Sequence, residues 1–156
     1  IKTDGTLWGW GTNYYGQLGQ NTEGANSKYS SPVQVPGTTW ATATASISVS
    51  HAIKTDGTLW SMGENHVGQL GLNSVISYSS PVQIPGTTWA NISCDQNRMM
   101  ATKTDGTLWM WGENTFGRLG QNNEVKYSSP VQVGSASDWA GARFNCNTQN
   151  IVFTNT

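Results

Sequence analysis

The chain has 156 residues, a formal net charge of −1 and a pI near 6.1, and only 11% of its residues are charged. This balance provides no basic surface for phosphate groups, so nucleic acid is excluded as an expected partner. No run of about 18 apolar residues occurs, which excludes insertion into a membrane. The chain opens with Ile1 inside a strand-like phrase, and we expect it to be a window from a longer chain.

The phrase Asp-Gly-Thr-Leu-Trp occurs three times, beginning at Asp4, Asp56 and Asp105. The later two copies are 105 − 56 = 49 residues apart, and the first two are 56 − 4 = 52 residues apart. Tandem copies of this length are typical of architectures that stack one unit on the next. We therefore expect a single repeat array over 1–156, with units of approximately 1–52, 53–101 and 102–150 and the start of a fourth at 151–156.

Each unit is expected to contribute four short strands. Residues 41–49 alternate Ala, Ile and Val with Thr and Ser, and this period of two predicts a strand. A second strand is expected at 51–55, before an Asp-Gly pair that favours a tight hairpin turn. A third is expected at 58–63, and a fourth at 81–84, before a Pro-Gly turn pair.

The third strand of each unit is apolar on both faces, as with Trp60 and Met62 against Leu59. Such a strand must be covered from both sides. Four-stranded antiparallel units that pack both faces on their neighbours are blades of a β-propeller, so we expect an all-β fold. Three blades would leave open edges, so further sequence is expected to complete the ring. Structural roles in stacking and turns are expected for Trp8, Trp10, Trp60, Trp109, Trp111, Gly16, Gly68 and Gly117.

Polar residues inside the repeat are interpreted in structural terms. Asn13, Asn65 and Asn114 share one repeat position and are expected to hydrogen-bond the backbone of the turn around them. Cys94 and Cys146 are interpreted as buried thiols, with a disulfide between neighbouring repeats as the alternative. No Cys/His cluster has metal-ligand spacing, and no nucleophile stands near a base, so we expect no metal, no cofactor and no enzymatic activity.

Successive antiparallel strands place alternate connections at opposite rims of a sheet. One rim, named here the constant rim, is expected to carry the Asp-Gly turns and the Pro-Gly-Thr-Thr turns, which barely vary between copies. The opposite or varied rim receives the loop between the first two strands and the long crossover after Gly-x-Leu-Gly. Both of these segments differ strongly between copies. Such difference indicates either a binding role or neutral drift in solvated loops.

The varied rim carries Tyr, Arg and Met, which are typical of binding patches. We therefore take its side chains as the candidate binding residues. They are Tyr14, Tyr15, His51, His66, Asp95, Gln96, Asn97, Arg98, Met99, Phe116, Asn145, Asn147, Thr148 and Gln149.

The pattern DGxLWxWGxNxxGxLG, followed by a variable loop and Ser-Pro, resembles the regulator of chromosome condensation repeat over essentially the whole chain. The resemblance implies a seven-bladed propeller, of which this chain would supply about three blades. Family repeats carry a Gly shortly before a His in the loop between the first two strands, and this chain does not, which counts against an exchange or chromatin role. The positions concerned are Ser46 and Val49, Asp95 and Arg98, and Asn145 and Thr148.

The diverged Asn-, Thr- and Ser-rich copies look like bacterial and bacteriophage members of the family, for which the resemblance implies surface attachment or protein binding. We therefore expect a non-enzymatic module on a virion or bacterial surface that binds protein or glycan through the varied rim. A purely structural subunit of a viral or cell-surface assembly is the first alternative. A regulatory propeller that acts as an exchange factor on a GTPase is the second.

Overall fold

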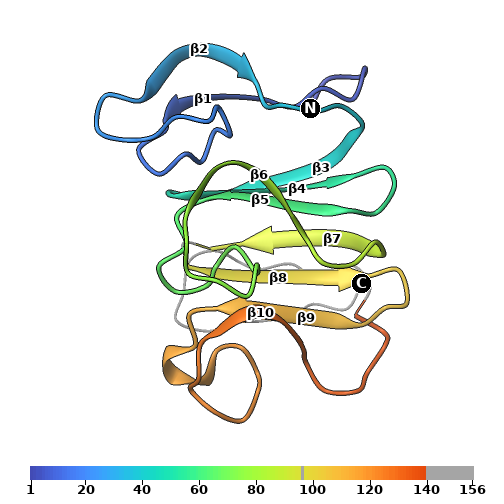
Figure 1. Ribbon diagram of the computed structural model, residues 1–156. Helices are drawn as coiled ribbons and strands as arrows, with labels where there is room; N and C mark the ends of the chain where they lie inside the picture. The colour runs from blue at the N-terminus through green and yellow to red at the C-terminus, as the bar shows by residue number, and fades with distance from the viewer. Residues whose placement is uncertain (96, 140–156) are drawn as a thin grey trace.

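The structure is a computed structural model that describes residues 1–95 and 97–139. Within these residues the strands form three antiparallel sheets, which lie one after another in chain order (Figure 1). The first sheet consists of β1 (Trp8–Thr12) and β2 (Lys28–Gln34). The second consists of β3 (Trp40–Ala45), β4 (Val49–Lys54), β5 (Leu59–Gly63) and β6 (Tyr78–Ile84). The third consists of β7 (Trp89–Cys94), β8 (Arg98–Lys103), β9 (Leu108–Gly112) and β10 (Tyr127–Gln132), with a short 3-10 turn, η1 (Thr115–Gly117), after β9.

The all-β fold with four-stranded antiparallel blades is confirmed, and each four-stranded sheet straddles two copies of the sequence repeat. In the second sheet, β3 and β4 precede the Asp56-Gly57 turn, whereas β5 and β6 follow it. Strands that are neighbours in sequence are also neighbours in the sheet, in the order β3-β4-β5-β6. Each four-stranded sheet therefore joins the last strand pair of one copy to the first strand pair of the next.

The Asp-Gly hairpin turns are fixed by a short series of side-chain hydrogen bonds. Asp56 Oδ1 accepts the Thr58 backbone N–H at 3.0 Å and the Thr58 hydroxyl at 2.7 Å. Thr58 Oγ1 in turn accepts the Trp60 Nε1–H at 2.9 Å. The same bonds recur from Asp4 through Thr6 to Trp8 and from Asp105 through Thr107 to Trp109. The repeated phrase therefore encodes a turn that also orients an indole ring.

A lysine covers that indole on the constant rim. Lys54 Nζ lies 4.3 Å from the centroid of the Trp60 ring and 5.0 Å from that of Trp40, and the two rings meet edge to face at 6.3 Å. Such a cation over an aromatic face contributes roughly 0.5–1 kcal/mol at exposed sites. In the third sheet the same arrangement joins Lys103 to Trp109 and Trp89.

Adjacent turns of the constant rim are in direct backbone contact. The Trp89 N–H donates to the Gly57 carbonyl at 3.1 Å. Gly57 has a φ of 78°, and a Cβ there would lie 2.3 Å from the Thr87 carbonyl oxygen. The Asp-Gly turn of one sheet therefore leaves no room for a side chain beneath the Pro-Gly-Thr-Thr turn that leads into the next.

One buried asparagine hydrogen-bonds the backbone of each crossover segment after β1, β5 and β9. Asn65 Nδ2 donates to the Ser74 and Ile76 carbonyls, both at 2.9 Å, and Asn65 Oδ1 accepts the Leu70 N–H at 2.9 Å. Asn13 and Asn114 bond their own crossovers in the same way. The predicted role of these three asparagines is confirmed.

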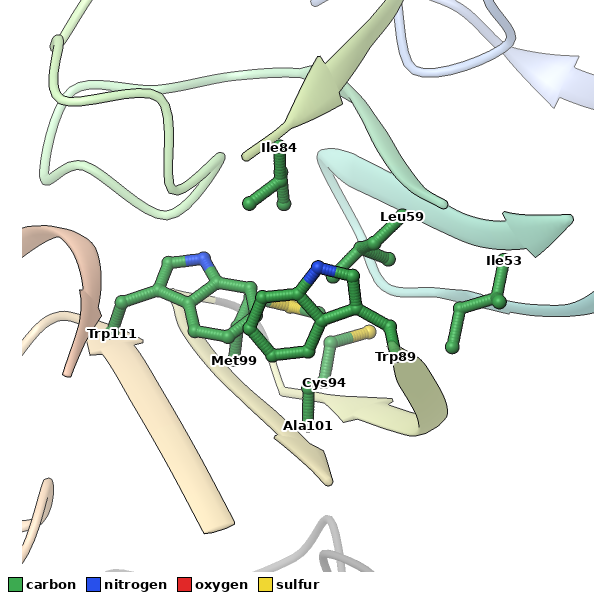
Figure 2. Packing of buried hydrophobic residues seen from close by; sticks show 8 residues of the cluster. All are labelled: Ile53, Leu59, Ile84, Trp89, Cys94, Met99, Ala101 and Trp111. Atoms are coloured by element: carbon green, nitrogen blue, oxygen red, sulfur yellow. The ribbon is translucent and has the colours of Figure 1, made fainter. Parts of the chain in front are cut away.

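The main core lies between the second and third sheets (Figure 2). Ile53, Leu59 and Ile84 of the second sheet face Trp89 and Trp111 of the third, whose ring centroids are 6.0 Å apart. Cys94, Met99 and Ala101 complete the cluster, so Cys94 is buried as expected. Cys146 lies outside the described residues. Stacked sheets thus bury the apolar faces that each sheet alone would leave open.

The repeat position of Trp10 differs in burial between the sheets. Met62 and Trp111 occupy the position equivalent to Trp10, and both are buried against the preceding sheet. Trp10 belongs to the first sheet of the chain, and 64% of its surface is exposed. Trp8, Trp60 and Trp109 are half-buried, and Trp111 is buried.

Two strand boundaries differ from the sequence-based expectation. The strand predicted at 41–49 ends at Ala45, and Val49 already belongs to β4, because Ser46 N–H turns back to the Val49 carbonyl at 2.9 Å. The strand predicted at 81–84 begins earlier, at Tyr78. Pro81 is tolerated inside it because β6 is the last strand of its sheet, where a missing N–H costs little.

Candidate functional site

The two rims are separated as the sequence predicts. In the second sheet, Ile53 pairs with Leu59 and Leu59 pairs with Ile84, so the ends of β4 and β6 lie at the same rim as the start of β5. The loop after β3 and the crossover after β5 lie at the opposite rim. Glu64 N–H donates to the Ser48 carbonyl at 2.9 Å, which ties these two varied segments together.

The structure removes three candidate binding residues from the surface: His51, Met99 and Arg98 are buried. His51 Nε2 lies 3.2 Å from the Gln69 carbonyl oxygen, to which Trp111 Nε1 also donates at 3.0 Å. Burial lowers the pKa of His51 to about 3, so the imidazole is neutral near physiological pH. Its place is in the interior between two sheets, which corrects the expectation that it faces a partner.

The expectation that Met99 and Arg98 lie at the binding surface is wrong for two different reasons. Met99 is part of the core cluster between the second and third sheets. Arg98 forms an ion pair with Asp95, and the Asp95 carboxylate also accepts the backbone N–H groups of Asn97 and Arg98. Arg98 and Asp95 therefore shape the loop between β7 and β8. Asp95 and Asn97 are half-buried.

Of the candidates, Tyr14, His66 and Phe116 are exposed, and Tyr15 is half-buried like Asp95 and Asn97. Phe116 is 72% exposed, has a φ of 66° and carries the Arg118 guanidinium 5.0 Å from its ring centroid. Gln96, Asn145, Asn147, Thr148 and Gln149 lie outside the described residues.

Tyr14, Tyr15 and His66 are brought together with Glu64 at the junction of the first two sheets, and we name these four residues the junction cluster. The two tyrosine rings meet edge to face at 4.7 Å, and Tyr14 is 48% exposed. The negative charge of Glu64 raises the pKa of the Tyr15 hydroxyl, and burial adds to this effect. His66 Nδ1 lies 3.2 Å from Glu64 Oε1.

Backbone contacts hold the junction cluster in place. Gln17 Oε1 accepts the Tyr15 N–H at 3.0 Å, and Gln17 Nε2 donates to the Ile47 carbonyl of the next sheet at 3.1 Å. Glu64 is fixed through its own N–H to Ser48. Glu64 is not among the binding residues predicted from the sequence. The signal that could have found it is the replacement of Thr12 in the first copy by Glu64 in the second.

The varied rim also exposes more apolar surface than the constant rim. Of the eight large apolar side chains that are exposed in the described part of the chain, six lie on varied-rim segments. Exposed apolar side chains on loops supply contact area when a partner covers them. Four of the six were not selected from sequence, because they are short apolar interruptions in otherwise polar loops. The six are Tyr14, Ile47, Val75, Ile76, Phe116 and Val125.

A cavity of about 330 Å³ lies between the first and second sheets. Leu7, Trp10, Ala43 and Met62 line it, and of the candidate binding residues only His51 does so. It adjoins β1, which pairs only with β2, whereas the equivalent strand β5 pairs with both β4 and β6. The cavity thus belongs to the packing of a two-stranded sheet, and we do not assign it a ligand.

Metal binding and membrane insertion find no support in residues 1–95 and 97–139. No group of three or more His, Cys, Asp and Glu side chains in these residues could hold a metal ion. Nor does this part of the chain contain a helix that is long and apolar enough to cross a bilayer.

Comparison with known proteins places the repeat in a family. The model of the regulator of chromosome condensation (RCC1) repeat matches residues 4–52, 56–99 and 105–142. No curated protein shows significant similarity to the chain.

Solved structures share the fold. Human WBSCR16 matches with a TM-score of 0.75 and 23% identity, over 86% of this chain and 36% of its own. Prp20p from Saccharomyces cerevisiae, described with its binding properties to Gsp1p and histones, matches with a TM-score of 0.77 and 15% identity, over 86% of this chain and 35% of its own. Yeast Prp20 bound to Kap60 gives a TM-score of 0.77 and 16% identity, over 86% and 34%. The chain thus spans about a third of the length of these structures.

Proposed function

Because the chain belongs to the regulator of chromosome condensation repeat family, whose model matches most of its residues, we propose that it is a non-enzymatic interaction module. Its partner binds the varied rim. The observation that carries this proposal is the gathering of six exposed apolar side chains on that rim. Apolar groups at loop tips stabilise nothing inside the fold, and they supply contact area when a partner covers them.

Protein is the ligand class that we favour over glycan. Prp20p is described through its binding to Gsp1p and histones and was solved with Kap60, all of them named as partners of that protein. The exposed set on the varied rim of this chain is aliphatic as well as aromatic, with Ile47, Val75, Ile76 and Val125. Aliphatic side chains of this kind suit a protein surface, whereas sugars are usually recognised by aromatic faces and polar groups.

We place the module on the surface of a virion or a bacterial cell. The support is compositional: charged residues make up 11% of the chain, while Asn, Thr and Ser take their place in the loops. A permanent structural subunit of such an assembly is the alternative use of the same apolar rim. An exchange-factor role on a GTPase would be recognised by the identity of the partner.

Site-specific photo-crosslinking in the source cell or particle tests the proposal. A photoreactive amino acid is placed at Ile47 or Ile76 on the varied rim and, as the matched control, at exposed Thr87 on the constant rim. We expect one protein to be captured from both varied-rim positions and not from Thr87. Ile76→Asp should weaken that capture by about tenfold, the effect of a buried interface anchor. Capture from Thr87 alone, or capture unchanged by Ile76→Asp, would contradict the proposal.

Two further readouts separate the alternatives. A glycan array probed with the intact protein would identify the second ligand class if binding were lost in Ile76→Asp. Stoichiometric co-purification without exchange of the captured protein would identify a permanent subunit.

A further inference from the structure

The junction cluster carries a negative charge that lacks the cation present at the equivalent place in the next sheet. Glu64 and Glu113 occupy the same repeat position. Glu113 is paired with Lys126 Nζ at 2.8 Å. In the second copy Ser77 stands where the third copy has Lys126, and the Ser77 hydroxyl accepts the Asn65 N–H instead. Glu64 therefore keeps its acidic side chain without the lysine.

The other neighbours of Glu64 do not replace that lysine. His66 contributes one ring nitrogen, Nδ1, at 3.2 Å from Glu64 Oε1, and the same nitrogen lies 3.3 Å from Gln69 Nε2. The first copy does have a lysine at this repeat position, Lys28, but in the described residues it forms no ion pair with Glu64. The Glu64 side chain is 18% exposed, so a group from solvent can still reach it.

The tyrosines of the cluster also lack a cation that similar rings in the chain possess. Lys2, Lys54 and Lys103 lie over tryptophan rings on the constant rim at 4.1–5.0 Å, and Arg118 lies over Phe116. Among the residues that the structure describes, no cation lies over Tyr14 or Tyr15. The partly exposed Glu64 carboxylate and the exposed Tyr14 ring, on adjoining segments of the varied rim, are together complementary to a cation.

We infer that the junction cluster binds an arginine side chain presented by a protein partner. The guanidinium group pairs with the Glu64 carboxylate and stacks on the Tyr14 ring. Arginine is favoured over lysine because its planar fork can pair with a carboxylate and stack on an aromatic face at once. The inference rests on the proposed function, and it adds the chemistry that the partner must carry.

A peptide titration on the full chain tests the inference. The probe is a short Gly/Ser peptide with a single arginine, compared with the same peptide carrying citrulline, lysine or glutamate. NMR follows the ring resonances of Tyr14, Tyr15 and His66. We expect the arginine peptide to shift these resonances and to bind about tenfold more tightly than the citrulline peptide.

Matched variants provide the decisive comparison. Glu64→Gln keeps the size of the side chain and should weaken arginine-peptide binding by about fivefold to tenfold. Ser77→Lys reproduces the third copy, so its ammonium should pair with Glu64. Arginine-peptide binding should then weaken by a similar factor. Glu113→Gln should leave peptide binding unchanged, because Lys126 already occupies Glu113. Thermal unfolding of each variant checks that it folds.

Several outcomes would overturn the inference: no shift in the cluster, equal binding of the citrulline peptide, or full binding by Ser77→Lys. These outcomes differ from a failure of the proposed function. If crosslinks still form at Ile47 and Ile76 while Ser77→Lys has no effect, the varied rim binds a partner by other means. If no varied-rim crosslink forms, the proposed function itself fails.

Discussion

The constant rim and the varied rim are the two ends of the same strands, yet they use their side chains in opposite ways. On the constant rim the repeated turn residues contact one another: Asp56 accepts hydrogen bonds from Thr58, Thr58 accepts one from Trp60, and Lys54 covers the indole. On the varied rim the buried Asn65 hydrogen-bonds the backbone carbonyls of the crossover, while side chains such as Ile76 are exposed to solvent. Residues that satisfy one another must be repeated together, whereas residues that serve only a partner can differ between copies.

The largest expected effect of a single change is on the constant rim, at Gly57. A Cβ in Gly57→Ala would lie 2.3 Å from the Thr87 carbonyl oxygen and would also force an L-residue to a φ of 78°. We expect a loss of about 3 kcal/mol in the free energy of unfolding. Gly24→Ala on the varied rim is the control, because it has a φ of 106° but nothing within 4 Å of its Cβ. It should cost only about 1–2 kcal/mol.

Denaturant titration measures both glycine variants. Equal losses would mean that backbone conformation alone matters at these turns, and the contrast between the tightly packed constant rim and the open varied rim would then disappear.

A smaller, pH-dependent effect is expected at His51, which lies in the interior. Above pH 6.5 the imidazole is neutral in both the folded and the unfolded state, so it adds no pH dependence. Below that value the unfolded chain takes up a proton that the folded chain resists, because the folded pKa is about 3. Stability should therefore fall on acidification by about 1.4 kcal/mol per pH unit, or about 2 kcal/mol at pH 5.

His51→Met removes this acid sensitivity and copies Met100, the equivalent residue of the third sheet. Denaturant titrations at neutral and acidic pH compare the slopes of the variant and the natural chain. A His51→Met variant that loses as much stability in acid as the natural chain would disprove the burial argument.

The smallest effect is expected at the exposed carboxylates of the constant rim. Hydrogen bonds from the Thr58 hydroxyl, and next from the Thr58 backbone, lower the pKa of Asp56 below its ordinary 3.8. The stabilisation is present above that value and is lost as the pH falls through the lower folded pKa. Asp56→Asn should therefore lower the melting temperature slightly at neutral pH, with the difference vanishing in strong acid.

The sequence predicts the fold well because the constraints are local and repeated. The Asp56-Gly57 pair forms the expected turn, and Asn65 bonds the backbone as its repeated position indicates. The strand at 41–49 is predicted too long because the alternation of small and polar residues continues through the loop, where Ile47 is exposed. Alternation reports the face of a residue and says nothing of where a strand turns back.

The candidate site is predicted less well, because difference between copies occurs in the interior as well as on the surface. His51 and Met99 differ from their counterparts Met100 and Ser50, yet both are buried where neighbouring sheets meet. Tyr14 and His66 were found because they are large side chains in crossover segments. Glu64 was missed because its interest appears only on comparison of two copies. The third copy has Lys126 to pair with Glu113, whereas the second copy has Ser77 at that position.

The offset between sheets and sequence copies bears on how such a chain changes length. A strand pair from one copy completes its sheet with a pair from the next, so duplication of one full period from any starting point adds one complete sheet and preserves every existing pairing. Unequal recombination between copies can therefore lengthen or shorten the array without producing a half-formed sheet in the middle. Each new sheet also arrives with its own crossover segment, which is free to diverge toward another surface.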